Sequence, residues 1–221
     1  MQQAAYHHGN LRQSLVSMGA ELLNTRGLTG ISLREIARKI GVGHNAPYRH
    51  FRNKQELLEA IAEDGFRRLK ARNTRLELEF AHDPEAQLFE SGMHIVTMAA
   101  EQPDLFQLMF GGVLRPKDCG ESLKLEVDAA MISLTRIIQS GQKQQVFVQG
   151  DPTKLALSAM SMVQGLALMV SSGKLGMNIK SSPQPVCQTL LRGMMLQLFD
   201  VFLLGIKQQT QTVASEEKKE N

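Results

Sequence analysis

The pattern of apolar and polar positions in this 221-residue chain is helical almost throughout. Apolar side chains recur every three or four residues, and no stretch shows the sustained alternation of a half-buried strand. The first expected helix covers residues 10–25, and Gly27 follows it as a stop signal. Its apolar face consists of Leu11, Leu15, Met18 and Leu22. The pattern therefore predicts an all-α fold.

Two short elements and a long helix follow the first helix. Ser32 stands at a helix start with Glu35 three residues later, which is the spacing of a capping box. A glycine-containing connection at residues 41–43 leads to a second short helix within residues 44–51. A long helix is then expected over residues 53–80, with an asparagine as its first capping residue.

Glycine and proline divide the remainder into about five further helices, so about nine are expected in all. We expect an N-terminal domain over residues 1–55, linked by the helix at residues 53–80 to a helical bundle over residues 56–207. Residues 208–221 are rich in Gln, Thr, Glu and Lys and have few apolar side chains to bury. We predict that this tail is disordered.

Charge is divided unevenly along the chain. Residues 1–75 hold 13 Lys and Arg against 6 Asp and Glu, whereas residues 76–221 hold 12 against 16. A basic N-terminal third favours contact with a polyanion, although an ordinary solvated basic face gives the same count. The N-terminus lacks the apolar core of an export signal, and polar residues interrupt the most apolar stretch, residues 155–170. We expect a cytoplasmic protein without a membrane span.

The cysteines and the known enzyme motifs give no indication of catalysis. Cys119 and Cys187 are too far apart for a CxxC site and have no histidine at zinc-ligand spacing. We interpret them as buried or tolerated thiols, with redox or electrophile sensing as the alternative. The chain has no GxSxG, P-loop, GxGxxG or HExxH motif. We therefore predict that it is not an enzyme, with no catalytic residues, no cofactor and no metal site.

The two short helices and their glycine turn form a helix-turn-helix pattern, in which the second helix enters the DNA major groove. His44 and Asn45 lie at the start of that second helix, where Asn can pair with adenine. Ala46 is small enough to approach a thymine methyl. Arg34 and the backbone amides beside Ser32 are placed for phosphate contact. Side chains suited to phosphate oxygens follow at Tyr48, Arg49, His50 and Lys54.

The segment ISLREIARKIGVGHNAPYRHFRNKQELL resembles the DNA-binding signature of the tetracycline-repressor (TetR) family of bacterial regulators. The likeness covers residues 10–60 and implies that the polar residues just named face DNA, above a core that includes Phe51, Leu57 and Leu58. Pro47 departs from the commoner leucine of the motif. Proline lacks an N–H and disfavours the helical conformation in the residue before it. We therefore expect an extended Ala46 and a second helix that starts late or is kinked.

Residues 103–112 and 155–170 resemble a C-terminal domain found in part of this family, marked by a Trp followed by a His-Gly pair. Met160 stands at the Trp position and Gln164 at the His position before Gly165, so the pocket chemistry is altered. The 12 methionines and 9 phenylalanines favour an adaptable apolar cavity, with plain core packing as the alternative. The expected lining is Met93, Val96, Phe106, Met109, Phe110, Met131, Leu134, Ile138, Met162 and Met169, with Gln164 and His94 as polar anchors.

The last two long helices carry apolar residues at helical spacing, and the resemblance implies that they form a dimeric four-helix bundle. We predict a homodimeric transcriptional regulator, a repressor that a small apolar or amphipathic effector releases from a palindromic operator. The alternative is a helical ligand-binding or adaptor protein without specific DNA binding. Acidic or apolar residues at positions 44–54 would favour that alternative, and the chain has neither pattern there.

Overall fold

The computed structural model of the chain describes residues 11–115, 118–175 and 184–206. Helices supply the regular structure of these segments, which contain no β-strand, and the all-α prediction is confirmed. The expected disordered tail lies outside the described residues. In chain order the elements are α1 (Leu11–Arg26), α2 (Leu33–Ile40), the 3-10 helix η2 (Pro47–Arg49), α3 (Lys54–Glu79), α4 (Pro84–Glu101), α5 (Pro103–Phe110), α6 (Glu121–Lys143), α7 (Pro152–Ser171) and α8 (Gln184–Ile206).

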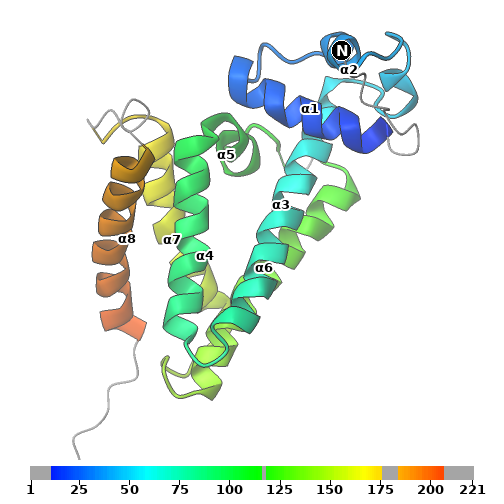
Figure 1. Ribbon diagram of the computed structural model, residues 1–221. Coiled ribbons are helices and arrows are strands. Elements are labelled where there is room, and N and C mark those ends of the chain that lie inside the picture. The colour runs from blue at the N-terminus through cyan, green and yellow to red at the C-terminus, as the bar shows by residue number, and fades with distance from the viewer. Residues whose placement is uncertain (1–10, 116–117, 176–183, 207–221) are drawn as a thin grey trace, which may run out of the picture.

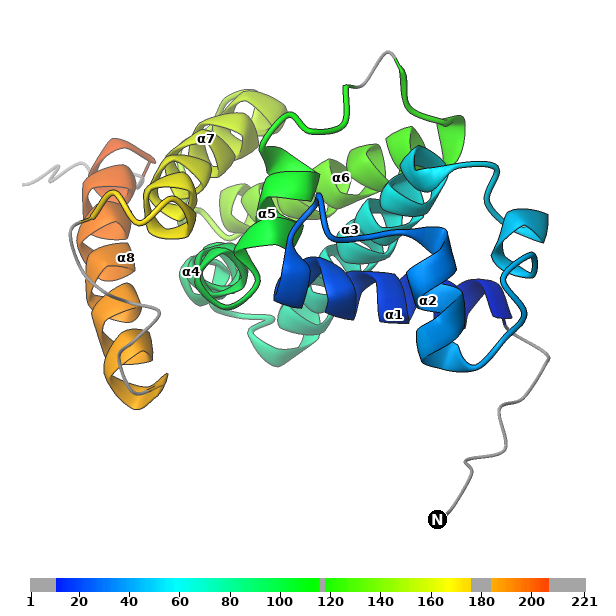
Figure 2. The same ribbon diagram turned by 90° about the horizontal axis from the view of Figure 1, so that it is seen from above.

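The helices form a small head and a larger body (Figure 1). The head comprises residues 11–53, with α1, α2 and η2. Helix α3 runs from the head into the body, where it packs along α6. Helix α4 lies within the body and contacts α5, α6, α7 and α8. Seen from above, α7 and α8 form the edge of the body away from α1 and α2 (Figure 2).

Proline at the first helical position begins α4, α5 and α7. Proline suits this position because the first N–H of a helix has no partner within the helix and the ring fixes a helical φ. The carboxylate of Asp83 accepts a hydrogen bond from the N–H of Ala86 at 2.9 Å, and Asp151 caps α7 in the same way. The chain breaks predicted at these prolines are therefore helix starts.

One continuous apolar core joins the head to the body. Ile36 of α2 and Ile61 of α3 are fully buried. Gly19 of α1 allows this packing, since a methyl group there would lie 2.8 Å from Ile61 Cδ1. The core continues through fully buried Ile137 of α6 to Leu191 of α8. Helix α3 belongs to head and body alike, so no gap in the core marks the expected boundary near residue 55.

A buried polar network fixes how α3, α4 and α6 meet. The Asn73 amide donates to the Ser133 hydroxyl at 2.9 Å and accepts from the Ser91 hydroxyl at 2.8 Å. Ser133 in turn donates to the carbonyl of Ala130 at 2.7 Å. Each of these three buried side chains therefore has a partner, which removes the cost of placing polar atoms in the core.

Helix α7 and residues Val186–Ile206 of α8 are apolar over most of their surface. Each is long and apolar enough to cross a membrane by length and composition alone, and 28% of its apolar 18-residue window is buried within the single chain. The core helix of a soluble protein meets the same criteria, so the absence of a membrane span stays a prediction. Ser158, Ser161 and Gln164 interrupt α7 but carry no charge, so the helix as a whole stays apolar.

Candidate nucleic-acid interface and effector cavity

The turn between α2 and η2 is set by the caps at the two ends of α2. The Ser32 hydroxyl accepts a hydrogen bond from the Glu35 N–H at 3.2 Å, as the predicted cap requires. Gly41 ends the helix at φ 74°, a left-handed conformation that favours glycine, and its N–H donates to the Ala37 carbonyl. The chain therefore turns sharply at the end of α2 and continues directly into residues 44–51.

Residues 44–51 differ from the second helix that the sequence predicts. Most of their hydrogen bonds join residues three apart, for example from the Arg49 N–H to the Ala46 carbonyl at 3.3 Å, and only Pro47–Arg49 form a short 3-10 helix. Pro47 has no N–H to donate to the Gly43 carbonyl, which receives the Ala46 N–H instead, at 2.9 Å. Ala46 itself is helical, with φ −60° and ψ −42°, so the expected extended conformation is wrong.

The polar residues of this segment point outward over an apolar base. Pro47 and Phe51 are buried beneath them, and Phe51 is 2% exposed. Leu57 and Leu58 continue this base, so the three predicted core residues are confirmed. Ala46 is half-buried, and Ser32 and Arg34 are exposed on α2. The exposed side chains of the segment are His44, Asn45, Tyr48, Arg49 and His50.

Lys54 occupies a different position from the other candidate DNA contacts. It is half-buried, and its ammonium group donates a hydrogen bond to the carbonyl of Leu28 in the α1–α2 loop. Lys54 therefore ties the start of α3 to the head, which leaves two of its three ammonium protons for other acceptors. Asn53, beside it, caps α3 by accepting from the Glu56 N–H at 3.0 Å.

The candidate interface carries cations that lie outside ion pairs. The two acids nearest the candidate interface are neutralised, since Glu35 pairs with Arg26 and Arg38, and Glu56 pairs with Arg52 at 3.1 Å. Within the described part of the chain, no acidic partner is found for Arg34, Lys39 or Arg49. This exposed surface can therefore bind a polyanion without first breaking an ion pair.

A second candidate site is an apolar cavity of about 350 Å³ between α3, α5, α6 and the middle of α7. Met109 and Phe110 of the predicted lining border it, and Lys124 and Asp128 supply charged groups. Met109 also covers Gly65 of α3 closely, since a methyl group on Gly65 would lie 2.4 Å from the Met109 sulfur. The remaining lining includes Ala62, Phe66, Leu108, Leu114, Cys119, Leu123, Val127 and Met160.

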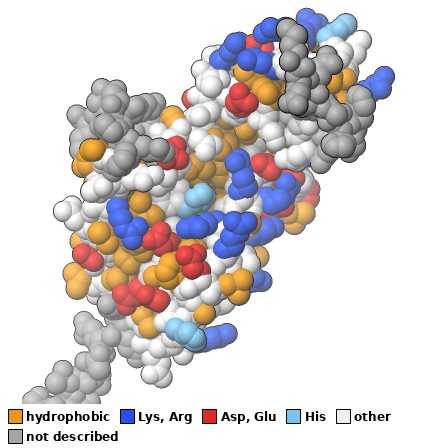
Figure 3. Space-filling model, viewed as in Figure 1, with side chains coloured by type: hydrophobic (Ala, Val, Ile, Leu, Met, Phe, Trp, Pro, Cys, Tyr) orange, Lys and Arg blue, Asp and Glu red, His pale blue; other side chains and the backbone are white. Residues whose placement is uncertain are grey.

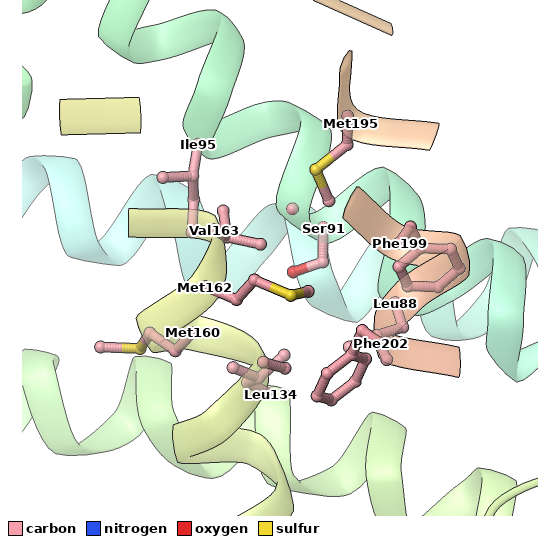
Figure 4. Close-up of a pocket in the computed structure, with 12 residues that line it drawn as sticks. Leu88, Ser91, Ile95, Leu134, Met160, Met162, Val163, Met195, Phe199 and Phe202 are labelled. Carbon is pink, nitrogen blue, oxygen red and sulfur yellow. The ribbon is translucent and has the colours of Figure 1, made fainter. Parts of the chain in front are cut away.

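The other predicted lining residues are not brought to this cavity. Leu134 and Met162 border a separate and much smaller space of about 20 Å³, whose lining residues are shown in Figure 4. Met93 lies with His94 at a polar hollow between α3, α4 and α8. Phe106 is fully buried core. Met131 and Gln164 are half-buried and border none of these three spaces.

Sequence reasoning missed most of the cavity wall. Phe66 was recognisable only as an apolar residue of the long helix, and Met160 only as the occupant of the Trp position. Nothing in the local sequence singles out Val127, which is 38% exposed. The lining of the cavity depends on which faces of the helices pack against each other. Sequence periodicity alone does not determine this packing.

Neither cysteine has the surroundings of a reactive thiol. Burial, Glu59 and Asp118 raise the pKa of the Cys119 thiol, and burial and Glu101 raise that of Cys187. A raised pKa disfavours the thiolate that reacts with oxidants and electrophiles. The described residues contain no group of three or more His, Cys, Asp or Glu that could hold a metal ion.

These features define an all-helical protein with an N-terminal helix-turn-helix and a helical body that contains a cavity. The family model described as bacterial regulatory proteins, tetR family, matches residues 15–61. Residues 15–61 of the chain therefore match the DNA-binding part of this family.

Relatives of known name match the N-terminal part. Tetracycline repressor protein class C of Escherichia coli is 42% identical over 52 residues, which is 24% of each chain. The HTH-type transcriptional regulator SrpR of Pseudomonas putida is 36% identical over 72 residues, 33% of this chain and 30% of its own. The matched segment thus spans about a quarter to a third of these curated relatives.

The whole chain is similar to a solved protein of unknown function from Rhodococcus sp. RHA1, with 30% identity, a TM-score of 0.75 and coverage of 93% of this chain and 100% of that one. AibR, solved with isovaleryl coenzyme A and operator DNA, shares the fold at 19% identity and a TM-score of 0.58, over 85% of this chain and 97% of its own.

Proposed function

We propose that this protein is a DNA-binding transcriptional regulator that acts in the cytoplasm as a homodimeric repressor. The observation that carries the proposal is the exposed set His44, Asn45, Tyr48, Arg49 and His50, held on a buried apolar base in the segment that follows a capped α2. Asn45 has the amide that pairs with adenine, and the other side chains suit phosphate oxygens. Arg34 and Ser32 extend the same surface along α2.

The 3-10 geometry of residues 44–51 is compatible with this role. Because most of their hydrogen bonds join residues three apart, consecutive side chains are about 120° apart around the axis, and side chains three apart lie on one side. Asn45 and Tyr48 are three residues apart, and both are exposed. From this one side, the Asn45 amide can bind a base edge in a DNA groove while the Tyr48 hydroxyl binds a phosphate beside the same groove.

The exposed apolar faces of α7 and α8 support the homodimer. A soluble single chain rarely leaves so large an apolar face uncovered, and a second copy supplies a matching face through two-fold symmetry. Gly165, Gly193 and Gly205 have open space above them, so a partner helix can approach closely there. A two-fold dimer presents two heads, and its natural target is a palindromic operator.

The apolar cavity supports control by a small effector. Its volume of about 350 Å³ suits a drug-sized apolar or amphipathic molecule, and Lys124 and Asp128 can orient a polar end. Met109 lies between the cavity and Gly65 of α3, the helix that begins beside the candidate interface. An effector that displaces Met109 therefore acts on α3 and shifts the head away from its DNA-binding position. It weakens DNA binding to the extent that it binds the shifted position more tightly than the DNA-binding one.

Selection of bound duplexes from a randomised DNA pool by the purified protein, at two salt concentrations, tests the proposed function. We expect a palindromic sequence at both concentrations and weaker overall binding at the higher one, because phosphate contacts release counterions. Sequence-blind binding that simply fades with salt would reject the specific regulator and favour a ligand-binding protein.

A further inference from the structure

A polar hollow of about 280 Å³ opens between α3, α4 and α8, apart from the candidate DNA interface and from the apolar cavity. Basic side chains gather over α3 on the same face of the molecule (Figure 3). The hollow combines two guanidinium groups with one carboxylate and several neutral side chains, and its lining is Arg72, Arg192, Glu90, Met93, His94, Thr97 and Gln188. Such a lining suits a ligand with negative charge and several acceptor oxygens.

The two guanidinium groups of the hollow differ in how they are held. Arg192 of α8 is fixed, because it pairs with Glu90 at 2.9 Å and its guanidinium lies 4.8 Å from the centre of the Phe89 ring. Arg72 of α3 is half-buried and has no ion-pair partner within the described segments. A half-buried cation without an anionic partner loses hydration without compensation, and a bound anion would supply that compensation.

The remaining charged groups near His94 carry both signs. An adjoining hollow of about 110 Å³ shares His94 and Thr97 and adds Arg68 and Glu101. Arg68 pairs with Asp64 at 3.2 Å, outside both hollows. The charged groups that line the two hollows are therefore three cations, on α3 and α8, and two carboxylates, on α4: Arg68, Arg72, Arg192, Glu90 and Glu101.

The pKa of His94 reflects the electrostatic potential in the hollow. Burial lowers its pKa, Arg72 and Arg68 lower it further, and Glu101 opposes them. The imidazole is therefore neutral near pH 7 and offers one donor and one acceptor, beside the Thr97 hydroxyl and the Gln188 amide. An anion near Arg72 would reduce the positive potential and raise the pKa of His94.

We propose that this hollow binds a small metabolite through a carboxylate or phosphate group, which lies between the guanidinium groups of Arg72 and Arg192. Guanidinium groups bind both kinds of oxyanion through paired hydrogen bonds, and Arg72 is the group that gains a partner. The site is distinct from the apolar effector cavity, and its lining comes from a single chain.

The test is a proton NMR titration of the His94 ring in the full chain, with its signal identified by its loss in His94→Gln. Sodium sulfate stands for a phosphate group and succinate for a carboxylate, and sodium chloride at equal ionic strength is the reference. We expect the pKa of His94 to rise with sulfate or succinate in a saturable manner, by about half a pH unit or more. The salt that gives the larger rise identifies the preferred group.

Two variants separate binding at this site from general screening. Arg72→Gln should abolish the saturable rise, whereas Arg75→Gln removes an exposed charge from the same helix and should keep it. Arg72→Lys keeps the charge but not the paired donors, and should weaken binding several-fold while unfolding at the temperature of the unmodified chain. Equal His94 pKa values in all three salts, or the same rise in Arg72→Gln as in Arg75→Gln, would overturn the proposal.

Discussion

The head and the helix pair α7–α8 differ in how many of their large apolar side chains are exposed. Among the described residues of the head, Tyr48 is the one exposed large apolar side chain, at 46%. The pair α7–α8 exposes eight large apolar side chains, namely Leu157, Leu168, Met169, Val186, Leu190, Leu196, Val201 and Leu204. The head is therefore complete within a single chain, whereas the pair leaves a face that another apolar surface can cover.

This difference indicates that the chain has two surfaces suited to partners of opposite chemistry, one charged and one apolar. The head buries its apolar residues within α1, α2 and the start of α3, and it exposes unpaired cations toward a polar, charged partner. The pair α7–α8 is suited to an apolar partner, for which a second copy of the chain is our proposal. Variants in one region therefore test whether the other region is affected.

The largest effect is expected when a charge enters the uncovered face of α8. In Leu204→Glu, the carboxylate would have to be buried in both protomers of the dimer, at a cost of several kcal/mol. We expect the dissociation constant of the dimer to rise more than about 1,000-fold. Sedimentation velocity across a concentration series measures it.

The matched control for this change is Leu78→Glu on α3, because Leu78 is 80% exposed and Leu204 is 81% exposed. Leu78→Glu should leave the dimer intact. If Leu204→Glu is equally dimeric, α8 does not form the interface. If the unmodified protein pellets with membranes while Leu204→Glu stays soluble, the pair α7–α8 contacts lipid. Its apolar partner is then a membrane and not a second copy of the chain.

The next effect concerns the head alone and separates base contact from phosphate contact. We expect Asn45→Ala to reduce discrimination at one operator base pair by about 1–3 kcal/mol, because it removes a bidentate pair. Arg49→Ala should weaken binding to all sequences alike and lower the slope of log affinity against log salt by about one. Both side chains are exposed, so unchanged unfolding temperatures are expected.

Fluorescence anisotropy with the selected operator and its single-base variants measures both changes. The assignment is contradicted if Arg49→Ala alters base preference and Asn45→Ala alters only the salt slope. Lys54 is a poorer choice for this test, because its hydrogen bond to the Leu28 carbonyl gives it a structural role as well.

Local signals in the sequence account for the parts of the head that were predicted correctly. Ser32 and Asn53 precede α2 and α3 and accept the expected backbone hydrogen bonds, and Gly41 adopts the left-handed conformation that ends α2. Each signal acts within about four residues, so it can be read without knowledge of the fold. Pro47 shows the limit, because the surrounding chain holds Ala46 helical against the local preference.

The body was predicted less completely, for a physical reason. Met109, Phe110, Leu134 and Met162 are all apolar residues of helices, yet the first two border the larger cavity and the last two border another space. Their sequence spacing sets the face of each helix but not which faces of different helices meet. Lining residues therefore follow from the packing of α3, α5, α6 and α7, which depends on contacts distant in sequence.

A moderate effect is expected when the effector cavity is filled. Val127→Trp places an indole at the cavity, and we expect the affinity for an anilinonaphthalene dye to fall about tenfold as apolar contact area is lost. Ile132→Trp is the control, since Ile132 is exposed on the same helix and does not line the cavity. Dye binding that is equal in the two variants would place the dye elsewhere, for example on α7 and α8, and Leu204→Glu would then reduce it.

The smallest effect tests the contact between α3, which carries the head, and α6 of the body. Glu126 of α6 accepts hydrogen bonds from Lys70 at 2.9 Å and from Arg67 at 3.3 Å, and these cations hold the pKa of the carboxyl below its ordinary value of 4.5. A lowered pKa in the folded state means that the carboxylate stabilises the fold above 4.5, and that this stability is lost as the pH falls through the lowered pKa.

Glu126→Gln should therefore lower the free energy of unfolding at pH 7 by less than about 1 kcal/mol, because the pair is partly exposed, and make stability less sensitive to acid below pH 4.5. Glu121→Gln is the control on the same helix, since Glu121 is exposed and lies 3.9 Å from Lys124. Urea unfolding between pH 3 and pH 7 measures both variants. Acid sensitivity reduced equally in the two variants would show that general charge, and not this contact, links α3 to the body.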